Sequence, residues 1–228
     1  MKIRCINLIA GLLLLFFFTI GSVKSQPGSS VFLFKPGDRS HWYIYLQGSK
    51  KGADSLGVFR FENGMIHVSG QKFGYIATEE SFSNFLLKLE FKWGVKKYPP
   101  RENDKRDAGI LYNGDIYDGD KIWPRSLECQ IQEGDCGDIW LIDSASVIHS
   151  DTMTRKEPYH RVVKSRDAEK PTGEWNQVEV IVNNGEITYM VNGQVVNKAK
   201  NPNPKAGRIL LQSEGAEIYY RKVELQKL

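Results

Sequence analysis

The sequence of 228 residues is poor in cysteine and histidine and has no nucleotide-binding signature. Its three cysteines and four histidines do not fall at the spacing of a zinc site. Glycine-rich phosphate loops, dinucleotide fingerprints and serine-histidine-aspartate elbows are also missing, so the sequence gives no support for a nucleotide-dependent enzyme or a serine hydrolase. No unit of fixed length recurs, and a propeller or a solenoid is therefore not expected.

The one long apolar run, over residues 8–20, lies close to the N-terminus. Lys2 and Arg4 precede it, and small and polar residues follow it, which is the pattern of a secretory signal cut after Ser25. The run is shorter than an ordinary membrane span, although a retained N-terminal anchor is the alternative. We therefore expect residues 1–25 to be a signal peptide and the mature chain to be exported, to the periplasm or the extracellular space, without a membrane span.

Removal of this signal leaves almost no net charge. The full chain has 31 basic and 27 acidic residues, a formal charge of +4, and three of the basic residues but none of the acids lie before residue 26. The mature chain would carry a charge of +1 and has no long cluster of lysine and arginine. Neither nucleic acid nor an anionic membrane is an expected partner.

Short strands and turns follow one another along residues 26–228, with almost no helical periodicity. The clearest strand covers residues 85–93, where large apolar side chains alternate with mostly charged ones. Asn63-Gly64 and Asn192-Gly193 are typical of tight hairpin turns. The pattern predicts a single all-β domain, a jelly-roll sandwich of two antiparallel sheets, in which one curved sheet forms a groove.

Residues 127–143 predict a hairpin in the middle of this domain. On a strand, Leu127 and Cys129 would point to the core, and Glu128 and Gln130 would point away from it. Turn-forming residues follow, and an apolar strand over residues 139–142 leads back. We expect acidic and amide side chains to lie together on the outer face.

Cys129 and Cys136, the two cysteines of the mature chain, both lie in this hairpin. In an oxidising compartment they would be able to form a disulfide, provided that their Cα atoms lie close enough. Two buried reduced thiols are the alternative.

Five segments together resemble a known family, the 3-keto-disaccharide hydrolases of secreted bacterial proteins, formerly a domain of unknown function. The resemblance covers roughly residues 42–228, and it implies a concanavalin-like jelly roll that cleaves glycosidic bonds in sugars oxidised at C3. The ketone of such a sugar acidifies the C2 proton, which opens a route of elimination and hydration. The segments that carry the resemblance are residues 85–93, 107–112, 128–133, 173–176 and 207–212, with Tyr220-Arg221 after them.

The chain departs from the family pattern at three places. Many members have Asp where this chain has Glu133, and Asn-Ser-Gly where it has Asp107-Ala108-Gly109. Many also have His at the position of Glu214. These differences bear on substrate preference and on the roles of the residues concerned.

Glu128, Gln130 and Glu90 are the candidate catalytic residues. Glu128, Gln130 and Glu133 form a Glu-x-Gln-x-x-Glu pattern, which is similar to the Glu-x-Asp-x-x-Glu strand of laminarinase-like glycosidases. A glutamine cannot share a proton as an aspartate does, so the pattern argues against ordinary retaining hydrolysis and leaves roles as base or ligand open. The alternative is that these residues simply form the polar outer face of a sheet.

Glu90 and Lys92 lie on the polar face of the strand over residues 85–93. If this strand is a neighbour of the central hairpin, both side chains line the same groove. The alternative is an ion pair on the protein surface, which contributes little to stability.

Six further residues are candidates for binding the substrate. Asp107 precedes a strand, where capping a turn is the alternative role, and Glu133 lies at a turn, where a solvated acid is common. His149 would serve as a general base if it reached the groove, although a surface histidine is the simpler interpretation. The aromatic residues would stack on sugar rings or pack in the core. The candidates are Lys92, Asp107, Tyr112, Glu133, Trp140 and His149.

Glu128, Asp107 and Asp138 are oxygen ligands of the kind that Ca²⁺ and Mn²⁺ accept. The sequence has no calcium-loop spacing, so a divalent metal is compatible with it but no cofactor is assigned.

Three hypotheses follow for function. The first is an exported enzyme that cleaves 3-keto glycosides, and the second is a carbohydrate-binding jelly roll without catalysis. The third is an interaction module on a cell surface, which a shallow, uncharged groove would favour. A carbohydrate is the expected ligand in the first two, and the oligomeric state is left open.

Overall fold

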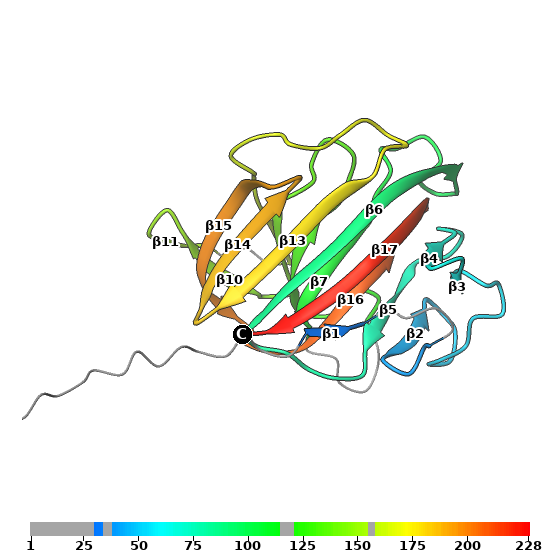
Figure 1. Ribbon diagram of the computed structural model, residues 1–228, viewed down its shortest axis with the longest axis horizontal. Coiled ribbons are helices and arrows are strands. Elements are labelled where there is room, and N and C mark those ends of the chain that lie inside the picture. Colours follow the sequence, from blue (N-terminus) through cyan, green and yellow to red (C-terminus); the bar gives the residue numbers. More distant parts are fainter. Residues whose placement is uncertain (1–29, 34–37, 115–120, 155–157) are drawn as a thin grey trace, which may run out of the picture.

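The computed structural model describes residues 30–33, 38–114, 121–154 and 158–228, which form two antiparallel β-sheets (Figure 1). The predicted signal peptide lies outside these ranges. No helix capable of crossing a membrane is found in the part of the chain that the structure describes. The prediction of an all-β sandwich of two antiparallel sheets is confirmed.

One sheet has ten strands in the order β11-β10-β15-β14-β13-β6-β17-β4-β3, with β1 paired to β17. Its strands are β1 (Ser30–Phe32), β3 (Phe59–Glu62), β4 (Met65–Val68), β6 (Phe85–Lys97), β10 (Ser146–His149), β11 (Thr152–Thr154), β13 (Asn176–Asn183), β14 (Glu186–Val191), β15 (Gln194–Asn203) and β17 (Ala216–Lys227).

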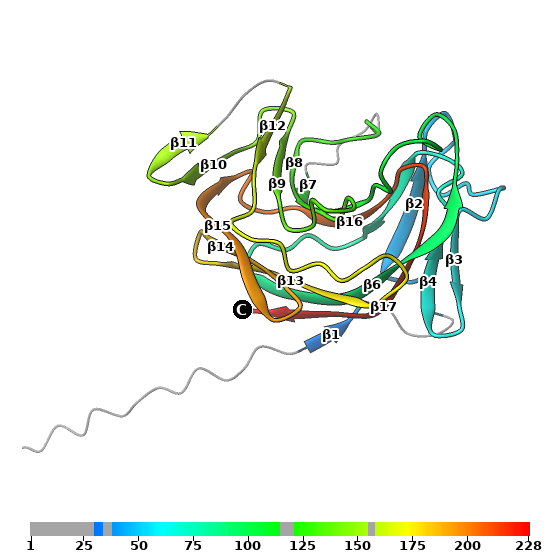
Figure 2. The same ribbon diagram turned by 90° about the horizontal axis from the view of Figure 1, so that it is seen from above.

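The other sheet has seven strands in the order β12-β9-β8-β7-β16-β5-β2. Its strands are β2 (Trp42–Leu46), β5 (Gly74–Thr78), β7 (Gly109–Gly114), β8 (Ser126–Gln130), β9 (Ile139–Ile142), β12 (Tyr159–Val162) and β16 (Arg208–Ser213). Figure 2 shows the two layers edge on, with β8, β9 and β16 in one layer and β6, β13 and β17 in the other.

Alternating side chains determine which face of each strand meets the core. In β6, Phe85, Leu87 and Leu89 are fully buried or nearly so, whereas the residues between them are half-buried. In the same way, Leu127 and Cys129 of β8 belong to the main apolar cluster between the sheets. The predicted hairpin of β8 and β9 is present, with Glu128 opposite Trp140.

The predicted hairpin turns use residues with positive φ. Asn63 and Gly64 have φ of 51° and 70°, and Asn192 and Gly193 have φ of 49° and 77°. Both central residues of a type I′ turn need this left-handed conformation, which Asn and Gly adopt with little strain. These turns join β3 to β4 and β14 to β15, as the sequence predicted.

Cys129 and Cys136 are both buried and free. Of the two alternatives that the sequence left open, the structure shows reduced thiols. Burial raises the pKa of each thiol well above its usual range, so neither is a reactive thiolate at neutral pH.

Tyr112 of β7 and Tyr189 of β14 join the two sheets through the core. Their hydroxyl groups lie 2.7 Å apart, their rings meet edge to face, and both side chains are fully buried. Tyr112 was predicted to contact a substrate, and this placement corrects the prediction: its side chain lies on the core face of β7, with the adjacent Ile110.

Tyr189→Phe should therefore destabilise the protein by about 1–3 kcal/mol, because the buried Tyr112 hydroxyl loses its partner. Tyr112→Phe combined with Tyr189→Phe should recover much of that loss, since no buried hydroxyl is then left unpaired. Urea unfolding of the two single variants and the double variant measures the coupling. Additive losses in the double variant would show that the hydroxyl pair is not a coupled interaction.

Candidate functional site

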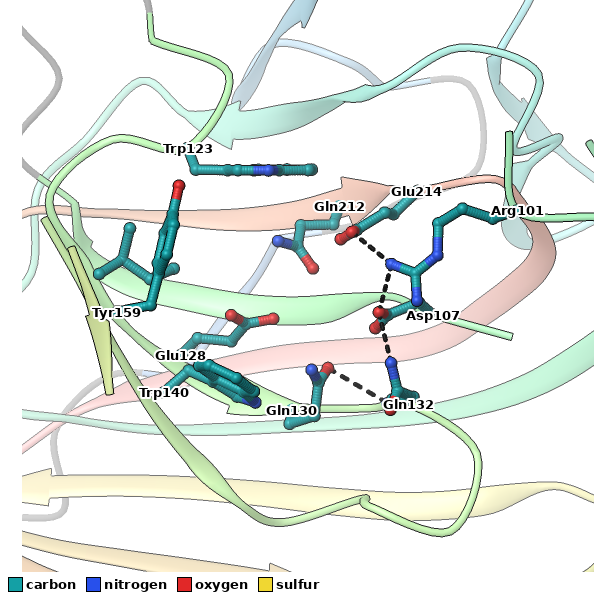
Figure 3. A pocket seen from close by; sticks show the side chains of 11 residues that line it. Arg101, Asp107, Trp123, Glu128, Gln130, Gln132, Trp140, Tyr159, Gln212 and Glu214 are labelled. Carbon is teal, nitrogen blue, oxygen red and sulfur yellow. Dashed lines mark hydrogen bonds and ion pairs between the residues drawn. The ribbon is translucent and has the colours of Figure 1, made fainter. Parts of the chain in front are cut away.

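A pocket of about 360 Å³ lies on the outer face of the seven-stranded sheet, over β7, β8, β9 and β16 (Figure 3). It combines carboxyl and amide side chains with aromatic rings. Its lining residues are Arg101, Asp107, Trp123, Glu128, Gln130, Gln132, Trp140, Ile142, Tyr159, Gln212 and Glu214.

Glu128 lies near the middle of the pocket, and a missing side chain on the next strand gives it room. A Cβ atom on Gly109 of β7 would lie 1.8 Å from Glu128 Oε1 and 2.6 Å from Gln212 Oε1. Since β7 lies between β8 and β16, the Glu128 side chain extends over Gly109 towards Gln212. Any other residue at position 109 would displace these polar groups.

Arg101 binds two carboxyl groups at one end of the pocket. Its Nη1 atom lies 2.6 Å from Asp107 Oδ2 and 2.6 Å from Glu214 Oε1. Gln132 Nε2 also donates to Asp107 Oδ2, at 2.6 Å. Glu128 is the third carboxyl group of the pocket, and Arg101 is the only arginine among the described residues that line it.

Burial raises the pKa values of these three acids. Burial raises the pKa of Glu128 well above its usual range, and the charges of Asp107 and Glu214 raise it further. Burial and the charge of Asp107 raise the pKa of Glu214 to about 8, against the opposing effect of Arg101. Burial also raises the pKa of Asp107, although Arg101 opposes this. The pocket therefore holds carboxyl groups that keep or exchange protons near neutral pH.

Gln130 is fixed by the chain that follows it. Its amide oxygen accepts hydrogen bonds from the backbone N–H groups of Ile131, at 2.9 Å, and Gln132, at 3.2 Å. The amide oxygen is occupied in this way, which leaves the NH₂ group as a donor for a ligand.

Trp123, Trp140 and Tyr159 line the other end of the pocket (Figure 3). Trp140 and Ile142 lie on β9, and Tyr159 pairs with Ile142 from the neighbouring strand β12. Trp123 precedes β8 and packs near Phe73, with ring centroids 6.4 Å apart. Rings of this kind can stack on the apolar face of a sugar or another flat group.

A model of the 3-keto-alpha-glucoside-1,2-lyase-like domain matches residues 31–226, nearly all of the chain. The chain belongs to this family. No curated protein matches it.

Solved structures share the fold of this family member at low identity. A candidate glycosyl hydrolase from Parabacteroides distasonis has a TM-score of 0.60 and 19% identity, with 88% of this chain and 94% of that chain covered. The β-glucanase of Bacillus licheniformis has a TM-score of 0.52 and 10% identity, covering 90% and 99%. The carbohydrate-binding module CBM66 from Bacillus subtilis has a TM-score of 0.54 and 9% identity, covering 82% and 96%. The jelly roll is thus shared with glycosidases and with a binding module.

The structure brings four of the predicted site residues of this family member together. Glu128, Gln130, Asp107 and Trp140 all line the pocket. They come from β8, β9 and the segment before β7, three neighbouring parts of the seven-stranded sheet.

Glu90 and Lys92 lie elsewhere, which corrects the expectation that they share the groove. They belong to β6, which pairs with β13 and β17 in the ten-stranded sheet. Glu90 binds Arg221 at 2.6 Å and Lys222 at 2.8 Å, and its pKa is lowered by these hydrogen bonds despite partial burial. Alternation correctly predicted the outward face of β6 but not the sheet to which the strand belongs.

Glu133 and His149 also lie outside the pocket lining, although both were predicted to bind substrate. The Glu133 carboxylate binds Arg106 Nη1 at 2.9 Å and Thr172 Oγ1 at 2.5 Å. His149 lies on β10 of the ten-stranded sheet.

Asp138, the third acid considered as a metal ligand, is not among the pocket residues. Its carboxylate binds Arg161 Nε and the backbone N–H of Lys164. Within the described ranges, no group of three or more His, Cys, Asp or Glu side chains is arranged to hold a metal ion.

Several pocket residues were not predicted because they come from loops or distant strands. Arg101 lies in a charged segment that resembles an ordinary solvated loop, and Trp123 and Tyr159 follow stretches without periodicity. Gln212 could have been predicted from the sequence. It follows the buried Leu211 in a segment that carries the family resemblance, so its side chain points to the opposite face of the strand. Glu214 was noticed only as a departure from the family pattern.

Glu214→Gln should make the protein more stable than the unmodified chain at high pH. The pKa of Glu214 is raised to about 8 in the folded state from the ordinary value of 4.5, so ionisation above pH 4.5 opposes folding. The cost amounts to roughly 1.4 kcal/mol for each unit of pKa difference, and a glutamine avoids it. Urea unfolding at about pH 4 and about pH 9 should show a gain for the variant only at the higher pH.

Glu80→Gln is the control, because Glu80 is an exposed acid paired with Lys227 at 3.3 Å. It removes only an exposed pair, which contributes little, so its effect on stability should stay small at both pH values. A gain for Glu214→Gln that does not depend on pH would contradict the raised pKa.

Proposed function

We propose that this chain is an exported enzyme that cleaves the glycosidic bond of 3-keto sugars by elimination followed by hydration. The observation that carries the proposal is the convergence of Glu128, Asp107 and Glu214 with amide side chains in one pocket beside aromatic rings. Membership of a family described as 3-keto-alpha-glucoside-1,2-lyase-like supports the choice of substrate. Export is proposed from the N-terminal signal pattern alone.

The chemistry requires one group to remove the C2 proton and another to protonate the departing oxygen. We assign removal of the C2 proton to the Glu214 carboxylate, because a base with a pKa of about 8 combines basicity with availability near neutral pH. The electron pair of the C–H bond forms an enolate with the C3 ketone. Arg101 and the NH₂ group of Gln130 are the donors assigned to the enolate oxygen.

Glu128 is assigned as the acid for the leaving group. Its pKa is raised well above the ordinary value, which favours the protonated carboxyl, so it can deliver a proton to the glycosidic oxygen as the C1–O bond breaks and C1=C2 forms. In the second stage water attacks C1, Glu128 takes a proton from the water, and Glu214 returns its proton to C2. The sum of both stages is hydrolysis, with every residue restored.

A carbohydrate-binding role without catalysis is the second candidate. The aromatic residues of the pocket favour it, and a binding module is among the structures that share the fold. It predicts sugar binding that survives Glu128→Gln and no release of product by any form of the protein.

Glu128→Gln should lower kcat on a 3-keto-glucoside by about 10²–10⁴-fold, because the acid is removed while its shape is kept. Product release is measured with the mature protein on the keto sugar and on the corresponding ordinary glucoside, with and without chelator. Only the keto sugar should react, and its C2-deuterated form should react more slowly.

Glu179→Gln is the matched control, since Glu179 lies on β13 in the ten-stranded sheet beside Lys88 and not in the pocket. It should leave turnover unchanged. The absence of turnover on the keto sugar would refute the enzymatic proposal, and equal rates for the protiated and deuterated sugars would refute elimination.

The pH profile tests the role of Glu214. kcat/KM should rise with pH as Glu214, with a pKa of about 8, loses its proton. Glu214→Gln should lower the rate and abolish the rising limb, whereas a purely structural role would lower the rate and leave the limb in place.

A further inference from the structure

The pocket has two chemically different ends, and Glu128 lies between them (Figure 3). At one end are Arg101, Asp107 and Glu214, linked by hydrogen bonds and ion pairs. At the other end are Trp123, Trp140 and Tyr159.

The oxidised sugar ring fits the charged end. Its ketone needs donors and its hydroxyl groups need acceptors, and both kinds of group are concentrated there. Gln212 Oε1 is a buried acceptor without a hydrogen-bond partner among the described residues. A sugar hydroxyl would satisfy it and remove the cost of an unpaired buried acceptor.

The scissile bond then lies beside Glu128, which we assigned as the acid for the departing oxygen. With the oxidised ring at the charged end, the leaving group extends past Glu128 towards Trp123 and Trp140. The aromatic end is therefore the leaving-group site.

The described residues of that end offer a ligand few hydrogen-bonding groups. Of the described lining residues there, the polar atoms are the indole N–H groups of Trp123 and Trp140 and the hydroxyl of Tyr159. Arg161 pairs with Trp140 across the sheet, but its guanidinium is bound by Asp138 and by Asp135, at 2.9 Å from the latter. Against these residues, a second sugar would lose the hydration of several hydroxyl groups, and each hydroxyl that finds no partner would weaken its binding.

A flat apolar ring suits these walls better. Trp123 and Trp140 are only half-buried, so their indole rings keep surface that a ligand can cover. Trp123 is supported by Phe73, and Trp140 is flanked by its strand partners Glu128 and Arg161. The rings are thus held in place before a ligand arrives, which lowers the entropy lost on binding.

From this arrangement, and resting on the proposed function, we infer that the preferred substrates are 3-keto glucosides with an aromatic aglycone, which binds between Trp123 and Trp140. The aglycone leaves as the free alcohol or phenol, with the proton that Glu128 supplies.

The test compares methyl and benzyl 3-keto-α-glucosides and a 3-keto disaccharide. Methyl and benzyl leaving groups are both simple alkoxides, so their comparison measures recognition of the ring more than leaving-group acidity. The unmodified protein should show kcat/KM about tenfold higher for the benzyl than for the methyl compound. Trp140→Ala and Trp123→Ala should each bring this ratio close to one, because the benzyl ring then loses a stacking surface that the methyl group never used.

Trp175→Ala is the matched control, because this tryptophan lies against Arg221 of the ten-stranded sheet, with the guanidinium carbon 3.9 Å from the ring centre. It should leave the benzyl-to-methyl ratio unchanged. A disaccharide rate above the benzyl rate, or an equal loss for both glucosides in Trp140→Ala, would overturn the inference.

Failure of the proposed function is recognised separately, because then not even the methyl compound reacts. In that case, fluorescence titration of the unmodified protein, Trp140→Ala and Trp175→Ala with benzyl and methyl α-glucoside tests the aromatic site alone. Tighter binding of the benzyl compound that only Trp140→Ala abolishes would support the site, and equal binding of the two compounds would overturn it.

Discussion

The chemistry of the pocket depends on the burial of three carboxyl groups around one arginine. Asp107, Glu128 and Glu214 line one site, and Arg101 is the single arginine among the described residues that line it. Arg101 contacts Asp107 and Glu214, whereas burial and the charges of these two acids raise the pKa of Glu128. Burial also raises the pKa of Glu214 to about 8, and this is why an ordinary carboxyl group can hold and release a proton here near neutral pH.

The two sheets divide the tasks of the molecule. Apolar side chains from both sheets form the core, and Tyr112 and Tyr189 connect the sheets by a buried hydroxyl pair. The seven-stranded sheet carries the pocket on its outer face, whereas the outer face of the ten-stranded sheet carries ion pairs such as that between Glu90 and Arg221. In the seven-stranded sheet, the inner face thus contributes to stability and the outer face carries the pocket.

Much of the fold and the centre of the site could be predicted from the sequence. The alternation of side chains along a strand shows which of them point away from the core, and it correctly predicted that Glu128 and Gln130 point outward. It does not show which strands become neighbours, so Glu90 was expected in the groove although its strand lies in the other sheet. The order of strands depends on contacts between distant segments, which no local pattern encodes.

The pocket residues that lie outside the central hairpin could not be predicted from the sequence, for a similar reason. Arg101 follows β6 of the ten-stranded sheet by a few residues, yet it reaches acids on the seven-stranded sheet. Tyr159 enters the pocket through the pairing of β12 with β9. The roles of Arg101 and Tyr159 therefore depend on how segments that are distant in sequence meet in the fold. Gln130 and Trp140, which lie on the same hairpin as Glu128, were predicted as site residues.

The absence of a side chain at Gly109 has a consequence for how relatives of this protein can diverge. A side chain at this position would displace the carboxyl group of Glu128 and the amide of Gln212, so the pocket keeps both groups in place while position 109 is glycine. The segments that carry Arg101, Trp123 and Tyr159 can change without disturbing that arrangement of Glu128 and Gln212 over Gly109. Such an arrangement allows one reaction to be kept while the range of molecules that undergo it changes from one organism to another.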